Sequence, residues 1–566
     1  MKQRGHLTYR NVLNVFPVII SVIALILYYP SLFGKFVIDD GSYFDDTVLT
    51  HLNLTDIKAV FRESTNRWGE LLPLRDYLYV IEYNVFAEWT TGYHIISLML
   101  FLASGFLVYY WTRVLFENHA FKDHTAANKN WLVKVSACIL MSFFLLNPMY
   151  VESVAYISGQ KDILSLFLIV ASFFFLYKIG RKSTQNVVWL FLFGVLLHYL
   201  AVLSKLIALA SIIFIPFLWL ITSNKKSRDI LKLVGFWLLA NIPVFIWIQY
   251  VFAQPKLTDI MISTSVYERT LRAINILGHH LSRIAWPNEL SFGYIFLWRK
   301  EYNFHWYTNF DLFTVIGLVF ILVLMVLFFR YRNSLITLGM LLFIIYLLPV
   351  LSIFPDMPNE KIYDRYLAIP LLGIFLMVLS LMQLISRLWP KSKVALAGFV
   401  VFLWVSWSVM TVNYIPTFKS DLAVRENRYR LNPNNDFNIM NYVKLLISAK
   451  KFAQAEFIIE NIDTNANLSE CIVEYLLGLS YMDQNKVDQA EKLLYSSSIK
   501  ASKTHDYPDA NYLLAVIYLN KGKVALAEAL LKEQLAHPYK PLYQTIRIEK
   551  LLKEIHDNKK KLEKSD

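Results

Sequence analysis

Two adjacent carboxylates, Asp39 and Asp40, are the first residues of the chain whose type and position could do chemistry. They end the segment Phe36-Val-Ile-Asp-Asp40, a few residues beyond the first long apolar run. Charge beside a bilayer is costly and usually serves a function. A carboxylate at a membrane exit suits a general base that removes a proton from an acceptor hydroxyl, although solvation in the interface alone would also explain the pair.

Further charged residues stand where other apolar runs begin or end. Glu152 and Asp162 belong to the segment 147–162, Lys205 lies in the short break between two runs, and Arg365 directly precedes another run. A guanidinium can bind a phosphate through two parallel hydrogen bonds, and an ammonium can stabilise a departing phosphate. A lysine that merely extends to the interface is the alternative for Lys205.

The composition indicates a membrane protein. Of the 566 residues, 56% are hydrophobic and 17% are charged, whereas soluble domains are about 25% charged. A transmembrane helix needs about twenty apolar residues. Runs of this kind predict eleven spans, at residues 11–30, 93–115, 131–147, 162–178, 187–203, 206–222, 233–252, 311–330, 334–352, 366–386 and 394–413. The predicted fold is therefore an all-α polytopic membrane domain over residues 1–415.

The basic residues favour one orientation of this domain. The net charge of +13 could suggest a nucleic-acid-binding protein, but the basic residues stand in short loops between apolar runs, so no nucleic acid is expected. With the N-terminus in the cytoplasm, the loops that hold Lys226, Arg330 and Lys391 are cytoplasmic, as the positive-inside rule requires. The charged residues described above and the tail then face the other side. Short loops favour the periplasm of a bacterial inner membrane, with the lumen of the endoplasmic reticulum as the alternative.

The tail, residues 420–560, is polar and contains an internal repeat. The segments 451–456, 486–491 and 523–528 share the pattern Lys-x-x-x-Ala-Glu at spacings of 35 and 37 residues. This period and the small residues Gly478, Ala490, Ala515 and Ala527 are typical of tetratricopeptide helix pairs. We expect a tetratricopeptide-like α-solenoid that binds a peptide or protein ligand; a passive cap over the outer loops is the alternative.

Several other kinds of site are not indicated. Cys138 stands in an apolar run and Cys471 in the tail, so no disulfide is expected. The adjacent pair His279-His280 would project in different directions from a helix, and no metal site is predicted from it or from His94. No phosphate-binding glycine loop is present, which argues against a mechanism powered by nucleotides.

The order of the polar motifs resembles one known family, the transmembrane and tetratricopeptide repeat-containing O-mannosyltransferases (the TMTC family). The motifs that carry the resemblance are Val37-Ile-Asp-Asp40, Leu72-Pro-Leu-Arg-Asp76, Gly92-Tyr-His94, Asn147-Pro-Met-Tyr-Val-Glu152, Gly159-Gln-Lys-Asp162, Ser204-Lys205 and Asp364-Arg-Tyr-Leu-Ala-Ile-Pro370. The resemblance covers nearly the whole chain. This chain departs from the family pattern at Leu206, where the family has a glutamate, and at Gln160-Lys161, which replaces an arginine-containing pair.

The resemblance implies a GT-C glycosyltransferase fold and a specific reaction. The donor would be a polyprenyl- or dolichyl-phosphate sugar, typically mannose, the acceptor a protein Ser or Thr hydroxyl, and the reaction an inverting displacement. Asp39 and Asp40 would supply the catalytic base. Arg75, Lys205 and Arg365 would face the lipid phosphate, and Glu152, His94 and Asp162 would contact the acceptor or substrate. No cofactor is predicted with certainty: the lipid-phosphate-linked sugar is the donor substrate, and a need for a divalent metal is left open.

Other functions remain open at this level. A related enzyme could transfer the sugar to a glycolipid or polysaccharide, or act as a ligase. A non-catalytic scaffold could use the repeats alone, but it would need one span rather than eleven. A transporter would place ionisable residues in the middle of the membrane, whereas here they gather near one face.

Overall fold

The structure is a computed structural model in which the chain forms two compact units, Met1–Ser420 and Asp421–Asp566. We describe each unit by itself. The structure describes residues 2–44, 51–52, 57–62, 70–119, 126–181, 186–253, 265–295, 311–332, 334–351, 353, 361–462, 470–501, 509–536 and 542–563.

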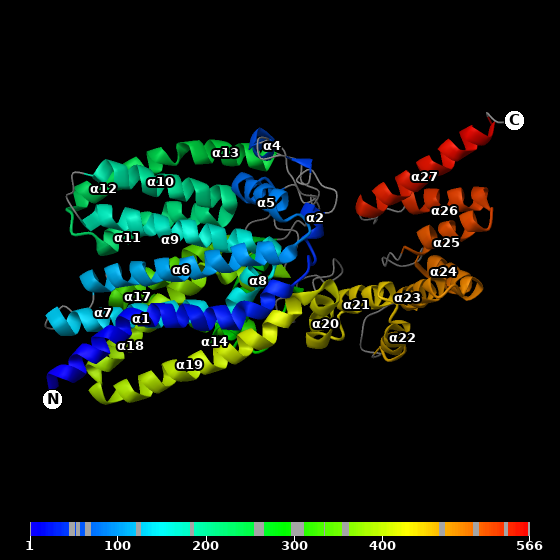
Figure 1. Cartoon of the computed structure of the whole chain (residues 1–566). Coiled ribbons are helices and arrows are strands. Elements are labelled where there is room, and N and C mark those ends of the chain that lie inside the picture. Colours follow the sequence, from blue (N-terminus) through cyan, green and yellow to red (C-terminus); the bar gives the residue numbers. More distant parts are fainter. Residues whose placement is uncertain are drawn as a thin grey trace. The chain divides into compact units, whose positions relative to one another are not determined.

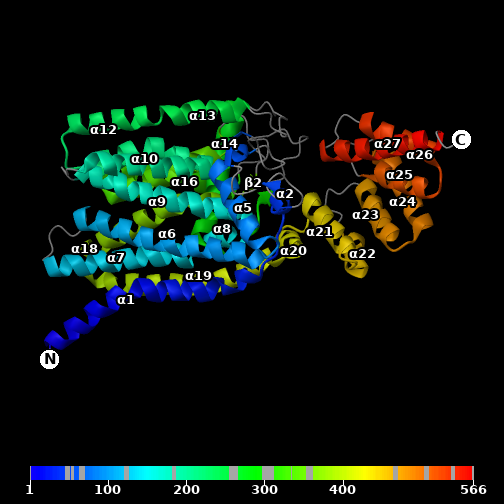
Figure 2. The same ribbon diagram turned by 45° about the horizontal axis from the view of Figure 1, so that its top comes forward.

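The first unit is a bundle of long apolar helices that run alongside one another in both ribbon views (Figures 1 and 2). Its α-helices are α1 (Lys2–Tyr28), α2 (Gly41–Phe44), α4 (Ile57–Arg62), α5 (Pro73–Phe86), α6 (Thr90–His119), α7 (Ala126–Leu146), α8 (Val151–Ala155), α9 (Gln160–Arg181), α10 (Val187–Ser204), α11 (Ala210–Thr222), α12 (Ser227–Ala240), α13 (Ile242–Ala253), α14 (Val266–Ala285), α16 (Leu312–Tyr331), α17 (Leu335–Leu347), α18 (Pro370–Leu388) and α19 (Lys393–Tyr414).

Within the described residues, nine helical segments are long and apolar enough to cross a membrane. They are Leu13–Phe33, Thr90–His119, Asn128–Leu146, Ile157–Arg181, Val187–Ser204, Ser227–Val251, Leu312–Tyr331, Pro370–Leu388 and Pro390–Lys419. The chain is therefore a multi-pass membrane protein.

Eleven spans were predicted, but only nine have the length of a membrane-crossing helix among the described residues. The two remaining predicted spans, 206–222 and 334–352, correspond to the shorter apolar helices Leu206–Thr222 and Leu335–Val350. Each contains a 13-residue α-helix extended by a 3-10 turn, at Leu206–Leu209 and Leu348–Val350. A 3-10 turn rises about 2.0 Å per residue against about 1.5 Å in an α-helix, so these segments reach further than their residue number suggests.

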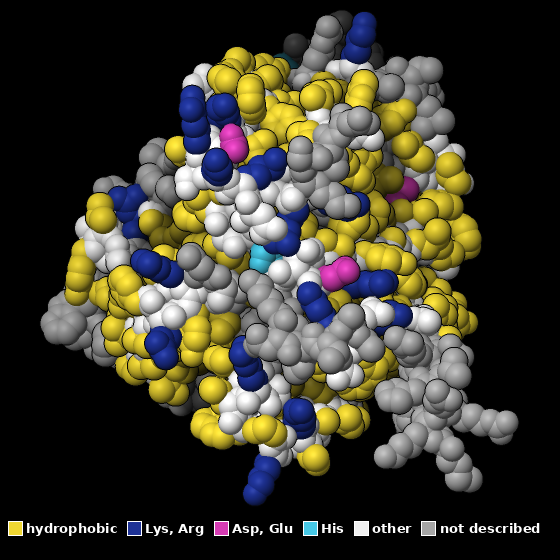
Figure 3. All heavy atoms as spheres, turned by 90° about the vertical axis from the view of Figure 1, so that its left-hand side faces the viewer, with side chains coloured by type: hydrophobic (Ala, Val, Ile, Leu, Met, Phe, Trp, Pro, Cys, Tyr) yellow, Lys and Arg dark blue, Asp and Glu magenta, His cyan; other side chains and the backbone are white. Residues whose placement is uncertain are grey.

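The two ends of this unit differ in charge. Figure 3 looks at the end on which the N-terminus lies, and Lys and Arg side chains far outnumber acidic ones there. At the opposite end, the short elements α2, α5 and α8 follow or precede the long helices (Figure 1). A two-residue antiparallel pair also forms, with β1 (Tyr294–Ile295) against β2 (Lys361–Ile362).

The second unit contains three helical hairpins that share one turn geometry. Its helices are α20 (Asp421–Leu431), α21 (Asp436–Ser448), α22 (Phe452–Glu460), α23 (Glu470–Asp483), α24 (Val487–Ala501), α25 (Ala510–Asn520), α26 (Val524–Ala536) and α27 (Leu542–Glu563). Lys450, Asn485 and Gly522 adopt positive φ angles of 58°, 62° and 74° between the helices of the three hairpins. The residue after each donates its N–H to a carbonyl five positions earlier, which is the Schellman closure of a helix end.

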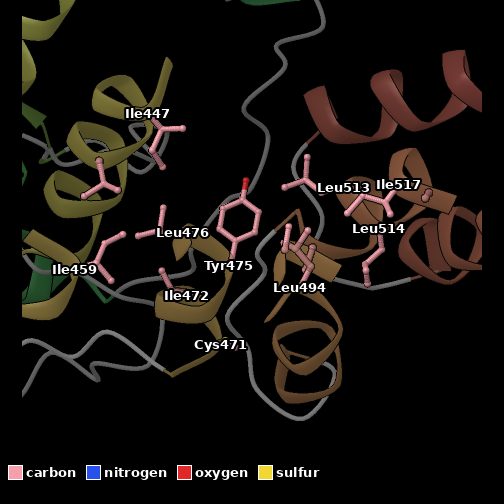
Figure 4. Close-up of a cluster of buried hydrophobic side chains, with 14 of the residues drawn as sticks. Ile447, Ile459, Cys471, Ile472, Tyr475, Leu476, Leu494, Leu513, Leu514 and Ile517 are labelled. Atoms are coloured by element: carbon pink, nitrogen blue, oxygen red, sulfur yellow. The ribbon is translucent and has the colours of Figure 1, made fainter. Parts of the chain in front are cut away.

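The repeated motif therefore marks the start of the second helix of each hairpin. A Cβ on Gly478 would stand 2.8 Å from Leu494 Cγ, and Ala490 is fully buried, so small residues allow α23 and α24 to pack closely. Figure 4 shows the core that these helices share, where Ile447, Leu476, Leu494 and Leu514 come from α21, α23, α24 and α25.

Candidate functional site

Charged and aromatic residues from distant parts of the chain meet at the end of the first unit opposite the N-terminus. We call this group the charged cluster. It consists of Asp39, Asp40, Glu70, Arg75, Glu152, Lys161, Asp162, Lys205 and Arg365, with the rings of Tyr156, Phe292, Tyr363 and Tyr366.

Asp40 is fully buried, and both of its oxygens accept hydrogen bonds. Oδ2 accepts from the Val37 N–H at 2.9 Å, and Oδ1 accepts from the Ser158 N–H at 2.8 Å and from the Ser158 hydroxyl. Burial raises the pKa of the Asp40 carboxyl to about 7, against the opposing effect of these donors. The Asp40 side chain thus links the segment that follows α1 to the 3-10 turn Ile157–Gly159, which precedes α9.

Asp39 differs from its neighbour because its side chain is only partly buried. Its N–H donates to the hydroxyl oxygen of Tyr156 at 3.3 Å. Ile38 precedes it with a φ of 54°, a left-handed conformation that a β-branched residue rarely adopts. This backbone turn allows Asp40 to point inward while Asp39 stays accessible.

Glu152 and Arg365 form a buried ion pair. Nη1 of Arg365 donates to Oε1 of Glu152 at 2.6 Å, and the backbone N–H of Arg365 donates to Oε2 at 3.2 Å. Burial raises the pKa of the Glu152 carboxyl, and the Arg365 guanidinium and backbone donors act in the opposite direction. Glu152 lies on α8, which is only five residues long.

Close backbone packing positions this pair. A Cβ on Gly159 would stand 2.6 Å from the carbonyl oxygen of Glu152, so only glycine allows the chain to turn back against α8. The Tyr150 hydroxyl donates to the carbonyl of Ala368 at 3.0 Å, which joins the α8 segment to the Asp364–Leu367 turn. The segment 147–162 therefore folds back on itself and packs against the turn that carries Arg365.

Aromatic rings surround the Arg365 guanidinium. Its Cζ lies 3.9 Å from the ring centroid of Tyr363, 5.4 Å from Phe292, 5.6 Å from Tyr156 and 5.7 Å from Tyr366. Distances within about 6 Å allow favourable cation–π interactions. The strand pair β1–β2 joins the segments that carry Phe292 and Tyr363. The Arg365 guanidinium is thus positioned by one carboxylate, Glu152, and by four aromatic rings.

Two lysines lie in the same cluster. Lys205 Nζ pairs with Asp162 Oδ1, and Lys161 Nζ lies 3.2 Å from Glu70 Oε2. Burial, followed by the positive charges of Arg365 and Lys161, holds the pKa of Lys205 well below its usual value. The side chains of Lys161, Lys205 and Arg365 are 12%, 13% and 9% exposed. Each of these cations therefore keeps a small exposed surface that an anionic ligand could contact.

Arg75 is enclosed by protein groups. Its Nε donates to Asp76 Oδ1 and its Nη1 donates to Glu70 Oε2, both at 2.6 Å, and Nη1 also donates to the Tyr43 hydroxyl at 3.3 Å. The side chain has no exposed surface. Arg75 belongs to the cluster through Glu70, which it shares with Lys161, and its expected contact with a lipid phosphate stays a prediction.

His94 lies apart from these ion pairs. It stands in the first turns of α6 and is buried against Gly34, where an added Cβ would lie 2.9 Å from its Nε2. The structure thus places His94 beside the loop that leads to Asp39, and its predicted contact with the acceptor stays a prediction.

Six members of the charged cluster were not predicted as site residues from the sequence. Glu70, Phe292 and Tyr363 lie outside every motif described above, whereas Tyr156, Lys161 and Tyr366 lie within such segments. A signal for Tyr156 was present, because it is a tyrosine inside a polar loop bracketed by apolar helices. No sequence signal marked Glu70 as the partner of two cations.

The adjacent histidines His279 and His280 are both buried. His279 stacks on Phe313 with ring centroids 3.6 Å apart, and burial lowers the pKa of His279 and of His280 to about 3. Among the residues that the structure describes, no group of three or more His, Cys, Asp and Glu side chains could hold a metal ion.

Comparison of the chain with protein-family models, with curated proteins and with solved structures found no match.

Proposed function

We propose that the protein is a membrane glycosyltransferase that moves a sugar from a polyprenyl- or dolichyl-phosphate carrier to a hydroxyl group. Mannose as the sugar and a protein Ser or Thr as the acceptor follow from the family resemblance, as does a GT-C type of fold for the first unit. The resemblance rests on the order of the polar motifs along the chain.

One observation carries the proposal: Tyr156 contacts both Asp39 and Arg365. Its hydroxyl accepts the Asp39 N–H at 3.3 Å, and the Arg365 Cζ lies 5.6 Å from its ring centroid. The partly buried carboxylate Asp39 and the guanidinium of Arg365 therefore lie against the same tyrosine side chain, and the slightly exposed Lys161 and Lys205 belong to the same cluster. This is the arrangement needed when a base activates a hydroxyl and a phosphate departs nearby.

The proposed reaction assigns a role to each of these groups. Asp39 takes the proton of the acceptor hydroxyl as the oxygen attacks the anomeric carbon of the donor sugar. The bond between that carbon and the carrier phosphate breaks, and the phosphate leaves with the electron pair. Lys161, Lys205 and Arg365 stabilise its charge. Attack opposite to the leaving group inverts the anomeric centre, and Asp40 positions the loop that carries Asp39.

Transfer of radiolabelled sugar from polyprenyl-phosphate mannose to endogenous acceptors, in membranes that contain the protein, tests the proposal. Asp39→Asn should abolish transfer while the protein stays folded. Asp229→Asn is the matched control, because Asp229 is an exposed carboxylate in the first turn of α12. Absence of transfer by folded wild type with several polyprenyl-phosphate sugars and acceptor present would overturn the proposal.

The proposal also includes an orientation and a role for the second unit. The basic end would face the cytoplasm, and the charged cluster would face the periplasm or lumen. The three hairpins would form a tetratricopeptide-like solenoid that holds the acceptor or a partner protein. Single cysteines at Lys226 and Glu70, in a chain without Cys138 and Cys471, would test the orientation: with the charged cluster in the periplasm, an impermeant thiol reagent should label only the cysteine at Glu70 in intact cells.

A further inference from the structure

A buried acid and a buried amide face each other beside the charged cluster. Glu82 lies on α5 and is 2% exposed, and Gln160 begins α9 and is fully buried. Gln160 Nε2 donates to Glu82 Oε1 at 2.7 Å. Neither residue belongs to the catalytic groups proposed above.

The remaining oxygens of this pair present a mismatch. Glu82 Oε2 and Gln160 Oε1 are both buried, and neither has a hydrogen-bond donor among the described residues. Two such acceptors in one hydrogen-bonded pair of side chains are unfavourable if Glu82 is ionised, because a buried acceptor without a donor costs about 1–3 kcal/mol and a buried charge costs more. One proton on the carboxyl group removes both deficits, because the acid O–H can donate to the amide oxygen.

We propose that Glu82 is protonated in the folded protein and forms a neutral, doubly hydrogen-bonded acid–amide pair with Gln160. The amide donates to one carboxyl oxygen, and the other carboxyl oxygen donates its proton to the amide oxygen. The pair joins α5 to the first turn of α9. Glu82 is thereby a positioning residue, because Lys161 and Asp162 of the charged cluster follow Gln160 directly.

The surroundings of Glu82 favour the neutral form. Two phenols, Tyr79 on α5 and Tyr93 on α6, lie close enough to Glu82 for its charge to act on them. The two charged residues that follow Gln160 on α9 pair elsewhere, Lys161 with Glu70 and Asp162 with Lys205. Burial raises the pKa of Glu82 to about 8, and the hydrogen bond from Gln160 opposes this only in part.

The proposal predicts a specific pH dependence of stability. The pKa of Glu82 rises from an ordinary value of 4.5 in the unfolded chain to about 8 in the folded chain. The stabilisation is therefore complete below about pH 4.5, is lost progressively as the pH rises toward about 8, and changes no further above that. Glu82→Gln replaces the protonated acid by an amide of the same shape, which keeps both hydrogen bonds at every pH.

Thermal unfolding of the purified full-length chain, followed from about pH 5 to about pH 9, tests the proposal without any assay of transfer. The melting temperature of wild type should fall relative to that of Glu82→Gln as the pH rises. Gln160→Glu should melt lower than wild type at neutral pH, because two acids would share one site. The exchanged double variant, Glu82→Gln with Gln160→Glu, should recover the wild-type melting temperature and its pH dependence.

A second measurement identifies the proton itself. The infrared spectrum of wild type should contain the carbonyl band of a buried protonated carboxyl group, and Glu82→Gln should lack that band. Equal pH dependence of the melting temperature in wild type and Glu82→Gln, or no loss of a carboxyl band in the variant, would overturn the proposal. Failure of the double variant to exceed Gln160→Glu in melting temperature would also overturn it.

Discussion

The Nη1 atom of Arg365 lies 2.6 Å from Oε1 of Glu152, although 213 positions separate the two residues in the chain. The contact joins the short helix α8 to the Asp364–Leu367 turn that precedes α18. Since both side chains are almost wholly buried, the pair holds two segments together as well as fixing a cation of the charged cluster.

Glu152→Gln should destabilise the protein, because the Arg365 guanidinium would stay buried without a countercharge. Loss of one partner of a buried ion pair costs about 3–5 kcal/mol. Thermal or denaturant unfolding of the purified protein measures the change. Glu528→Gln is the control, since Glu528 pairs with Lys532 on an exposed helix face and such pairs contribute about 0.3–0.5 kcal/mol. Equal effects of the two substitutions would contradict a supporting role for Glu152.

Asp40 should make stability depend on pH. Burial raises its pKa from 3.8 to about 7, so its contribution to folding is greatest below about pH 3.8 and is lost as the pH rises to about 7. A shift of this size corresponds to at most about 4 kcal/mol. Relative to Asp40→Asn, the free energy of unfolding of wild type should therefore fall over this interval. Parallel pH profiles for wild type and Asp40→Asn would contradict the expected titration.

Residue types and spacing predicted which charged residues face one side of the membrane, but not which of their side chains are buried or paired. Spacing after an apolar run marked Asp39 and Asp40 together, but it could not show that Ile38 adopts a left-handed conformation or that Asp40 alone is fully buried. Motif order marked Arg75 as a phosphate ligand, yet its surroundings include Glu70, which no motif indicates. Pairings of this kind depend on tertiary packing, so residue types and spacing cannot reveal them.

The fold was predictable to a similar degree. Of the eleven spans predicted from hydropathy, nine correspond to long apolar helices among the described residues, and the period of 35 and 37 residues predicted helix pairs in the tail. The lengths of α11 and α17 could not be predicted from hydropathy, which does not distinguish an α-helical residue from a 3-10 residue.

Under the proposed function, Lys205 should bind the donor phosphate. Lys205→Met should raise the KM for the lipid-phosphate sugar about 10- to 100-fold, because a hydrogen bond to a charged group contributes about 1.5–3 kcal/mol. Lys205→Arg keeps the charge and should restore much of the affinity. The lowered pKa of Lys205 also means that donor affinity should decline with rising pH sooner than for an ordinary lysine.

Kinetics with a soluble short-chain donor analogue would provide these values. Lys391→Met serves as a control, since Lys391 lies in the 3-10 turn between α18 and α19 and is exposed. An unchanged KM for Lys205→Met would exclude a contact between Lys205 and the donor phosphate, and an equal rise for Lys391→Met would indicate a general effect of charge.

Gly278 should be indispensable for the packing of α14 on α16. A Cβ at Gly278 would overlap the carbonyl oxygen of Phe313, and a Cβ at Gly317 would overlap that of Ile274, so the two helix backbones are nearly in contact. Gly278→Ala must push the helices apart, and overpacking of this kind costs about 1–3 kcal/mol or more. Since α14 leads to the segment that carries Phe292, the rings around Arg365 should shift as well.

Gly398→Ala provides the matched control for this substitution. Gly398 lies on α19 with nothing within 4 Å of its added Cβ, and alanine is favoured over glycine within helices by about 1 kcal/mol. The melting temperature should therefore fall for Gly278→Ala and stay equal or rise for Gly398→Ala. If both variants melted at the wild-type temperature, the backbones of α14 and α16 would have to lie further apart than the structure places them.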